Sequence, residues 1–248
     1  MFKSIKSFVQ NKFVNRIGIF ALICGLVFTV WAIIPIGPVQ SDLDEVIKDE
    51  QLEIIDKPNY VVLRAKDSVA TTGLIFYPGA KVDSRSYLYK LAPLARQESA
   101  VIFVTKPFLK YAFTDVNGAD KVREENKNIK TWILGGHSLG GSMACKYTKD
   151  HSEIKYLILI GSYCIDDLSK SSVRALSILG SEDGLISKDK IYNYKSNLPA
   201  NTRYETIQGM NHAQAGNYGS QLGDKPSKSP DSFVKLQISV VLNSYFRG

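Results

Sequence analysis

The stretch at residues 131–150, TWILGGHSLGGSMACKYTKD, decides the fold. Its first part, TWILGG, is typical of a buried strand, and LGGSMACKYTKD (139–150) is typical of a helix. The junction is Gly136-His137-Ser138-Leu139-Gly140, a G-x-S-x-G pentapeptide. Where a strand turns this sharply into a helix, the serine lies at the apex in a strained backbone conformation, and Gly136 and Gly140 are needed because no side chain fits beside it.

The rest of the chain from about residue 59 alternates β-rich runs with helix-like segments. This alternation predicts an α/β fold with a doubly wound, mostly parallel sheet flanked by helices. We expect strands at residues 60–65, 73–78, 101–106, 131–136, 156–161, 175–180 and 202–207. We expect helices at residues 84–97, 118–128, 139–150, 188–196 and 231–246. Only about a dozen residues join the strands at 156–161 and 175–180, so no helical cap is inserted there and the pocket should be open.

Ser138 is the candidate nucleophile. The turn exposes its hydroxyl at the carboxyl edge of the sheet, where open α/β folds place their sites. It also aims the Leu139 amide at the oxyanion that forms during acyl transfer. The alternative is a glycine-rich turn with an incidental serine.

A serine hydroxyl needs an adjacent base, and the chain has three histidines. His137 lies inside the turn and should point away from the serine. His151 ends a polar helix, where a solvated surface histidine is expected. Elimination and position therefore favour His212, which follows the strand at 202–207, as the base.

The third member of a triad must accept a hydrogen bond from the other imidazole nitrogen. Asp183 directly follows the strand at 175–180 and falls between the serine and the histidine in the chain, the order expected for a strand-to-helix nucleophile turn. Glu182, Asp166 and Asp167 compete for this role, but a polar loop and a helix start explain them more simply.

A second oxyanion donor should come from the loop after an earlier strand. Tyr77-Pro78-Gly79-Ala80 occupies that place, and the Ala80 amide is the predicted donor. The alternative is that Pro-Gly merely makes a turn.

With these residues in place, the chain resembles the α/β-hydrolase superfamily, and within it the small, cap-poor branch of dienelactone hydrolases and carboxylesterases. The likeness is carried by FYPGAKVD (76–83), GGHSLGGSMA (135–144), LGSEDGL (179–185) and GMNHAQAGNYGSQLGD (209–224). It implies a hydrolase of carboxylic esters or related acyl bonds, with neither a metal nor an organic cofactor. The chain departs from dienelactone hydrolases proper, which use a cysteine nucleophile, and from relatives of the last motif, which carry an aromatic residue near Ala215. The segment 217–219 either lines the pocket or forms a glycine-rich surface loop.

The expected function is therefore a serine hydrolase that acts on a small acyl or ester substrate through a Ser-His-Asp triad and a covalent acyl-enzyme. Two alternatives use the same fold. One is a surface acyltransferase with the same triad, and the other is a catalytically silent module that binds a ligand or partner.

The N-terminal segment predicts a single-pass membrane anchor. Residues 17–41 carry no charge, and residues 17–37 are long enough to cross a bilayer as a helix. A cleaved signal peptide, which would make the protein secreted, is the alternative, but its apolar region is usually shorter and no A-x-A pattern follows. Ile23 before Cys24 argues against lipid attachment. Basic residues precede the segment and acids follow it, so residues 1–16 should be a cytoplasmic tail, 38–58 a stalk and 59–248 a catalytic domain outside the cytoplasm.

The charge and the cysteines exclude other classes. The formal net charge is +7, but four of these charges lie before the first acid at Asp42, which leaves +3 without any Lys/Arg-rich run. Nucleic-acid binding is therefore not expected. Cys145 and Cys164 lack the spacing of a metal site and are expected to be small buried residues, with a bridge between them as the alternative outside a cell. The pattern does not predict an oligomeric state.

Overall fold

The computed structural model describes the backbone of residues 2–97 and 99–247, and the side chains of these residues except 2–13, 28, 31–33 and 247. The chain divides into two compact units, Met1–Pro35 and Ile36–Gly248. The first unit contains the single helix α1 (Phe2–Ile33). The second holds every other helix and strand described below.

The predicted membrane anchor at residues 17–37 is not supported. Among the described residues, no helix combines the length and the apolar character that a bilayer crossing needs. Four side chains of the predicted anchor, at 28 and 31–33, lie outside the described residues. The predicted span also runs past Ile33, the last residue of α1. Its residue Ile36 already belongs to the second unit, where its N–H donates to the Lys81 carbonyl oxygen at 2.7 Å.

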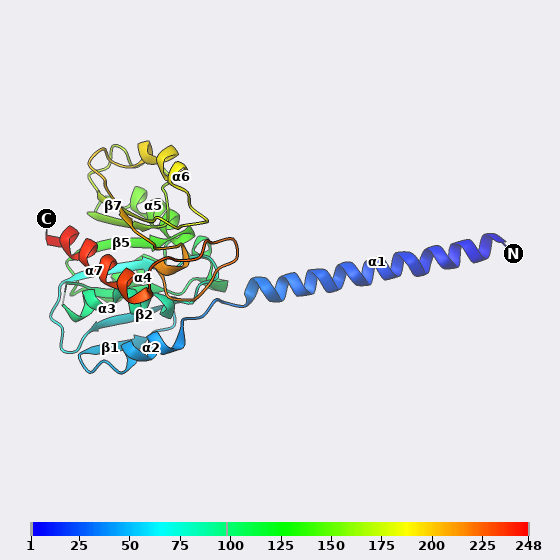
Figure 1. The fold of residues 1–248 in the computed structure, drawn as a ribbon, viewed down its shortest axis with the longest axis horizontal. Coiled ribbons are helices and arrows are strands. Elements are labelled where there is room, and N and C mark those ends of the chain that lie inside the picture. The colour runs from blue at the N-terminus through cyan, green and yellow to red at the C-terminus, as the bar shows by residue number, and fades with distance from the viewer. Residues whose placement is uncertain (1, 98, 248) are drawn as a thin grey trace. The chain divides into compact units, whose positions relative to one another are not determined.

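An eight-stranded sheet forms the centre of the second unit, in the order β1-β2-β4-β3-β5-β6-β7-β8 (Figure 1). β2 pairs antiparallel with β1 and β4, and every other neighbouring pair is parallel. The mostly parallel sheet predicted from the alternation is thereby confirmed. The strands are β1 (Leu52–Asp56), β2 (Tyr60–Ala65), β3 (Thr72–Tyr77), β4 (Val101–Thr105), β5 (Thr131–His137), β6 (Tyr156–Ile160), β7 (Arg174–Gly180) and β8 (Arg203–Ile207).

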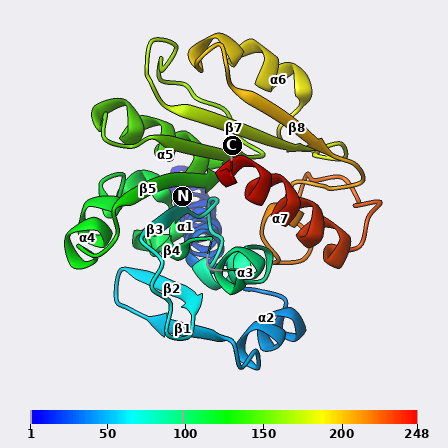
Figure 2. The same cartoon turned by 90° about the vertical axis from the view of Figure 1, so that its left-hand side faces the viewer.

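Helices cover both faces of this sheet, so central strands such as VIFVT of β4 are buried along their whole length. Figure 2 shows α3 and α7 on one side and α4 and α5 on the other, in agreement with the two clusters of buried apolar residues. The helices are α2 (Gln40–Ile47), α3 (Leu88–Arg96), α4 (Gly118–Glu125), α5 (Leu139–Asp150), α6 (Lys188–Asn193) and α7 (Asp231–Arg247). The helices predicted at 84–97 and 188–196 each include a short 3-10 turn, η1 (Ser84–Tyr87) before α3 and η4 (Lys195–Asn197) after α6.

Residues 38–58, predicted to form a stalk, belong instead to the folded unit. They contain α2, which buries Leu43 and Val46, and β1, which pairs with β2 from Leu52 to Asp56. The prediction missed them because their few apolar residues are scattered among acids. A solvent-facing helix and an antiparallel edge strand need only one apolar face.

A topological switch point lies between the carboxyl ends of β3 and β5. These strands are neighbours, but the chain leaves β3 through α3 and β5 through α5, which lie on opposite faces of the sheet. Open α/β sheets bind ligands in the crevice outside such carboxyl ends. The loops that carry Ala80 and Ser138 begin there.

A disulfide joins Cys145 in α5 to Cys164 in the loop after β6. The expectation of two separate buried cysteines is therefore wrong. The 19-residue separation has no motif that would reveal the pair, and only the packing of α5 beside β6 brings the two Cα atoms to 5.6 Å.

We predict that Leu242→Ala lowers the free energy of unfolding by about 2–5 kcal/mol, because it opens a cavity under α7. Leu242 is 0% exposed, whereas Leu236 on the same helix is 58% exposed. Leu236→Ala is thus the matched control and should change stability by roughly 0.5 kcal/mol or less. Urea denaturation of the two variants checks this, and equal losses would contradict the packing of α7 on the sheet.

Candidate active site

The strand-to-helix turn holds Ser138 in an uncommon conformation. Ser138 lies between β5 and α5 with a φ of 52° and a ψ of −124°. Its N–H donates to the Ile160 carbonyl oxygen at 3.1 Å. A Cβ added at Gly136 would lie 2.5 Å from the Gly140 carbonyl oxygen. A Cβ at Gly140 would collide with the carbonyl oxygens that end β3. Both predicted glycines are therefore required by backbone contact, and the serine occupies the apex.

Asp183 and His212 are brought together at the same edge of the sheet. His212 Nδ1 lies 2.8 Å from Asp183 Oδ2, and both side chains are buried. The other carboxylate oxygen of Asp183 accepts the backbone N–H groups of Leu185 at 2.9 Å and Ile186 at 2.7 Å. Because the carboxylate can only accept, Nδ1 carries the proton and Nε2 is left with a lone pair.

The imidazole lies beside the strand end next to Ser138. A Cβ built on Gly161 would be 3.1 Å from His212 Nδ1 and 3.0 Å from Asp183 Oδ2. Gly161 directly follows Ile160, the residue whose carbonyl holds the Ser138 N–H. His212 Nε2 is buried and has no hydrogen-bond partner among the described residues, so a bond to the Ser138 hydroxyl is not formed in this structure. Catalytic hydrogen bonds are often long before substrate binds.

The competing acids have other partners. Glu182 pairs with Lys228 at 3.0 Å, and Asp166 pairs with Lys149 at 3.4 Å. Asp167 accepts the Ser169 N–H at 2.9 Å. His151, the residue after α5, is bonded through Nδ1 to the carbonyl oxygen of Tyr147 in that helix at 2.8 Å.

Two backbone amides without a hydrogen-bond partner among the described residues follow the ends of β3 and β5. Leu139 is the first residue of α5, and the first N–H groups of a helix have no intrahelical acceptor. The Ala80 N–H donates no hydrogen bond to any described residue, whereas the Gly79 N–H donates to the Tyr87 hydroxyl at 2.7 Å. Gly140 packs on the carbonyls just before this loop, so both free amides lie at one edge.

Tyr87 is a site residue that the sequence did not reveal. Its hydroxyl accepts from the Gly79 N–H and lies within hydrogen-bond distance, 2.9 Å, of His137 Nδ1. Complete burial raises the pKa of Tyr87, which keeps its hydroxyl protonated. Burial also lowers the pKa of His137 well below its usual value, and its ring centroid lies 4.4 Å from that of His212. The sequence of the predicted helix at 84–97 does not indicate that Tyr87 contacts His137.

The segment at 217–219 is buried at its first two residues and exposed at Gly219. Asn217 and Tyr218 are buried, and Asn217 Nδ2 donates to Asp42 Oδ2 at 2.6 Å. The ring of Tyr218 lies 6.2 Å from that of His137, measured between centroids. It also fills the space beside Gly216, next to the buried Ala215. Asn217 and Tyr218 therefore belong to the packing beside the His212 loop, whereas Gly219 lines the cavity described next.

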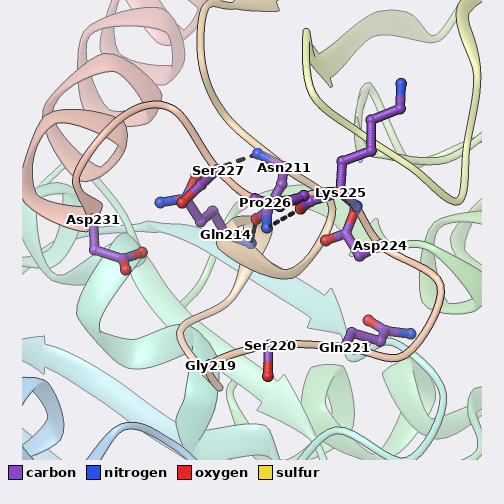
Figure 3. Close-up of a pocket in the computed structure, with 10 residues that line it drawn as sticks. All are labelled: Asn211, Gln214, Gly219, Ser220, Gln221, Asp224, Lys225, Pro226, Ser227 and Asp231. Carbon is purple, nitrogen blue, oxygen red and sulfur yellow. Dashed lines mark hydrogen bonds between the residues drawn. The ribbon is translucent and has the colours of Figure 1, made fainter.

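A polar cavity of about 480 Å³ adjoins the same loop (Figure 3). Asn211, Gln214, Asp224 and Lys225 are among the residues that line it, but Ser138, Asp183 and His212 are not. Within the part of the chain that the structure describes, no group of three or more His, Cys, Asp or Glu side chains is arranged to hold a metal ion.

Comparisons with known proteins agree with the fold. A family model described as the alpha/beta hydrolase family matches residues 73–234, more than half of the chain. A search of curated proteins finds no match.

Three solved structures share the fold. Carboxyl esterase 2 of the mycorrhizal fungus Tuber melanosporum is 11% identical, with a TM-score of 0.57 over 81% of this chain and 87% of its own. Est1E of Butyrivibrio proteoclasticus is 12% identical, with a TM-score of 0.57 over 80% of this chain and 100% of its own. A predicted CIB-like hydrolase of Thermoplasma acidophilum is 20% identical, with a TM-score of 0.53 over 78% and 98%.

We predict that buried His137 makes the fold sensitive to acid. Its folded pKa lies below the usual 6.5, so the unfolded chain takes up the proton first as the pH falls. Stability contributed by this residue is complete above pH 6.5 and is lost below it, by at most about 1.4 kcal/mol per pH unit. His137→Gln should flatten the dependence of unfolding free energy on pH between roughly pH 5 and 6.5, while the slopes of variant and wild type agree above pH 7. Urea denaturation across this range measures it, and an unchanged acid slope in the variant would contradict the assignment.

Proposed function

Because the chain belongs to the α/β-hydrolase family, we propose that it is a serine hydrolase that cleaves carboxylic esters or related acyl bonds. The observation that carries the proposal is the hydrogen bond between His212 Nδ1 and Asp183 Oδ2, at the sheet edge where the strained turn presents Ser138. The name of one structural neighbour, a carboxyl esterase, favours esters as the substrate class.

In the proposed reaction, the Ser138 hydroxyl attacks the acyl carbonyl while His212 Nε2 takes its proton. The buried Asp183 carboxylate stabilises the resulting imidazolium. The free Leu139 and Ala80 amides donate to the oxyanion of the tetrahedral intermediate. His212 then protonates the leaving alkoxide, which departs and leaves an acyl-enzyme. Water, deprotonated by His212, attacks this ester and releases the acid, and the proton returns to Ser138.

Two neighbouring groups support these proposed roles. Tyr87 holds the Gly79 N–H, which leaves the Ala80 N–H as the unoccupied donor of that loop. Neutral His137 beside His212 adds no second positive charge when the imidazolium forms. The proposed base is therefore opposed by no neighbouring cationic ring.

We predict that Ser138→Ala lowers kcat for p-nitrophenyl acetate by about 10⁴-fold or more and abolishes labelling by a fluorophosphonate probe. Ser152→Ala, a change at an exposed serine beyond α5, is the control and should keep wild-type turnover and labelling. Undiminished labelling of Ser138→Ala would remove this serine from the mechanism.

We further propose that the domain works outside the cytoplasm, in an oxidising compartment. The support is the Cys145–Cys164 disulfide, since such bonds persist where thiols are not kept reduced.

The proposed compartment predicts how many cysteine thiols are free to react. Of the three cysteines, only Cys24 should react with a maleimide in the denatured, unreduced protein isolated from its native cells. All three should react after reduction. Mass spectrometry counts the adducts, and three adducts without reductant would exclude the bridge and the proposed compartment.

A further inference from the structure

Asp224 connects the two loops that carry the proposed acid and base. Its Oδ1 accepts the N–H of Gly184, the residue after Asp183, at 2.9 Å. Its Oδ2 accepts the N–H of Ala213, the residue after His212, also at 2.9 Å. One carboxylate thus spans two loops that follow different strands, β7 and β8.

The segment around Asp224 is itself held against both loops. Oδ1 also accepts the Lys225 N–H at 2.9 Å, and the Lys225 carbonyl accepts from Asn211 Nδ2 at 2.8 Å. A Cβ on Gly184 would lie 2.5 Å from the Lys225 nitrogen, so the two backbones are in direct contact. Figure 3 shows Asp224 and Lys225 on the loop that passes beside Asn211. Backbone contacts therefore hold the Asp224 carboxylate in a defined place, although the residue is partly exposed and lines the cavity.

Only a carboxylate satisfies this arrangement. It faces three N–H donors and offers two oxygens that accept without donating. An asparagine in the same rotamer would satisfy one side and place its NH₂ against an N–H on the other. The proposed reaction needs the Asp183–His212 bond held in a fixed geometry, and a misplacement of about 1 Å in such a site can cost roughly 100-fold in rate.

From these contacts we infer that Asp224 is a positioning residue, which fixes the His212 imidazole on Asp183 by tying Gly184 to Ala213. This inference rests on the proposed function. Asp224 bonds backbone amides and not the triad side chains, so it acts through the two loops.

The test compares Asp224→Asn with Asp167→Asn in the full chain. Asp167 is the matched control, because it is also a loop aspartate that accepts a backbone N–H, at 2.9 Å from Ser169, but bridges no second loop. For p-nitrophenyl acetate we expect Asp224→Asn to lower kcat by about 10- to 100-fold with KM within roughly threefold of wild type. Asp167→Asn should keep the wild-type kcat.

Proton NMR supplies a readout that a merely structural role would not move. The His212 Nδ1–H proton, hydrogen-bonded to Asp183, should resonate at low field in wild type and Asp167→Asn and shift or broaden in Asp224→Asn. In wild type, the Gly184 and Ala213 amides should be protected from hydrogen exchange, a measurement that stands even where the variant does not fold. Unprotected amides at both positions overturn the inference.

The two levels of the proposal fail in different ways. If Ser138→Ala is inactive but Asp224→Asn keeps the wild-type kcat and the wild-type imidazole resonance, the positioning role is wrong and the serine mechanism stands. If Ser138→Ala remains as active as wild type, the proposed function itself is wrong. A loss of thermal stability in Asp224→Asn with unchanged kcat per folded molecule also rejects the positioning role.

Discussion

The close approach of three backbones at the end of β5 is the constraint on which the rest of the site depends. Gly136 and Gly140 meet across the turn, and Gly140 also rests on the carbonyls that end β3. Ser138 can stand at φ 52° only because these contacts hold the chain on both sides. The same contacts place Gly140, the residue after Leu139, against Tyr77 and Pro78, which precede the loop of Ala80. A single packing arrangement thus fixes the serine turn against the end of β3.

Parallel register extends this order to the acid and the base. Neighbouring strands are paired near their carboxyl ends, as in His137 with Ile160, Ile160 with Ile178 and Gly180 with Ile207. Residues that directly follow these strands must therefore emerge at the same edge, however far apart they are in the chain. Asp183 follows β7 and His212 follows β8, and their side chains join across that edge. The sheet brings Asp183 and His212 to the same edge, and the loops orient their side chains.

The features that could be predicted from sequence are those with a local physical signature. Buried parallel strands are short, continuous apolar runs, so YLILI of β6 and VIFVT of β4 were assigned nearly to the residue. The pentapeptide has a steric reason for each glycine, and chain order then singles out Asp183 and His212. The placement of these two side chains against each other agrees with that reasoning. The roles of the triad and of Ala80 remain predictions that turnover experiments must test.

Features that depend on contacts between distant segments left no such signature. The edge strand β1 and helix α2 carry mixed, acidic sequences and became visible only through their partners. The hydrogen bonds of Tyr87 and Asp224 join residues whose neighbours in sequence say nothing about the loops that they reach. The Cys145–Cys164 pair is of the same kind, since the packing of α5 on β6 brings the two sulfurs together.

That covalent link ties the helix that begins beside Ser138 to the loop that continues from Gly161. A disulfide that closes a chain segment of 19 residues restricts the unfolded ensemble. In the simplest entropic treatment, this raises the free energy of unfolding by about 3 kcal/mol. A reductant in the surroundings therefore acts on this protein as a mild denaturant does. The stability of the folded state therefore depends on the redox potential of the surroundings as well as on temperature.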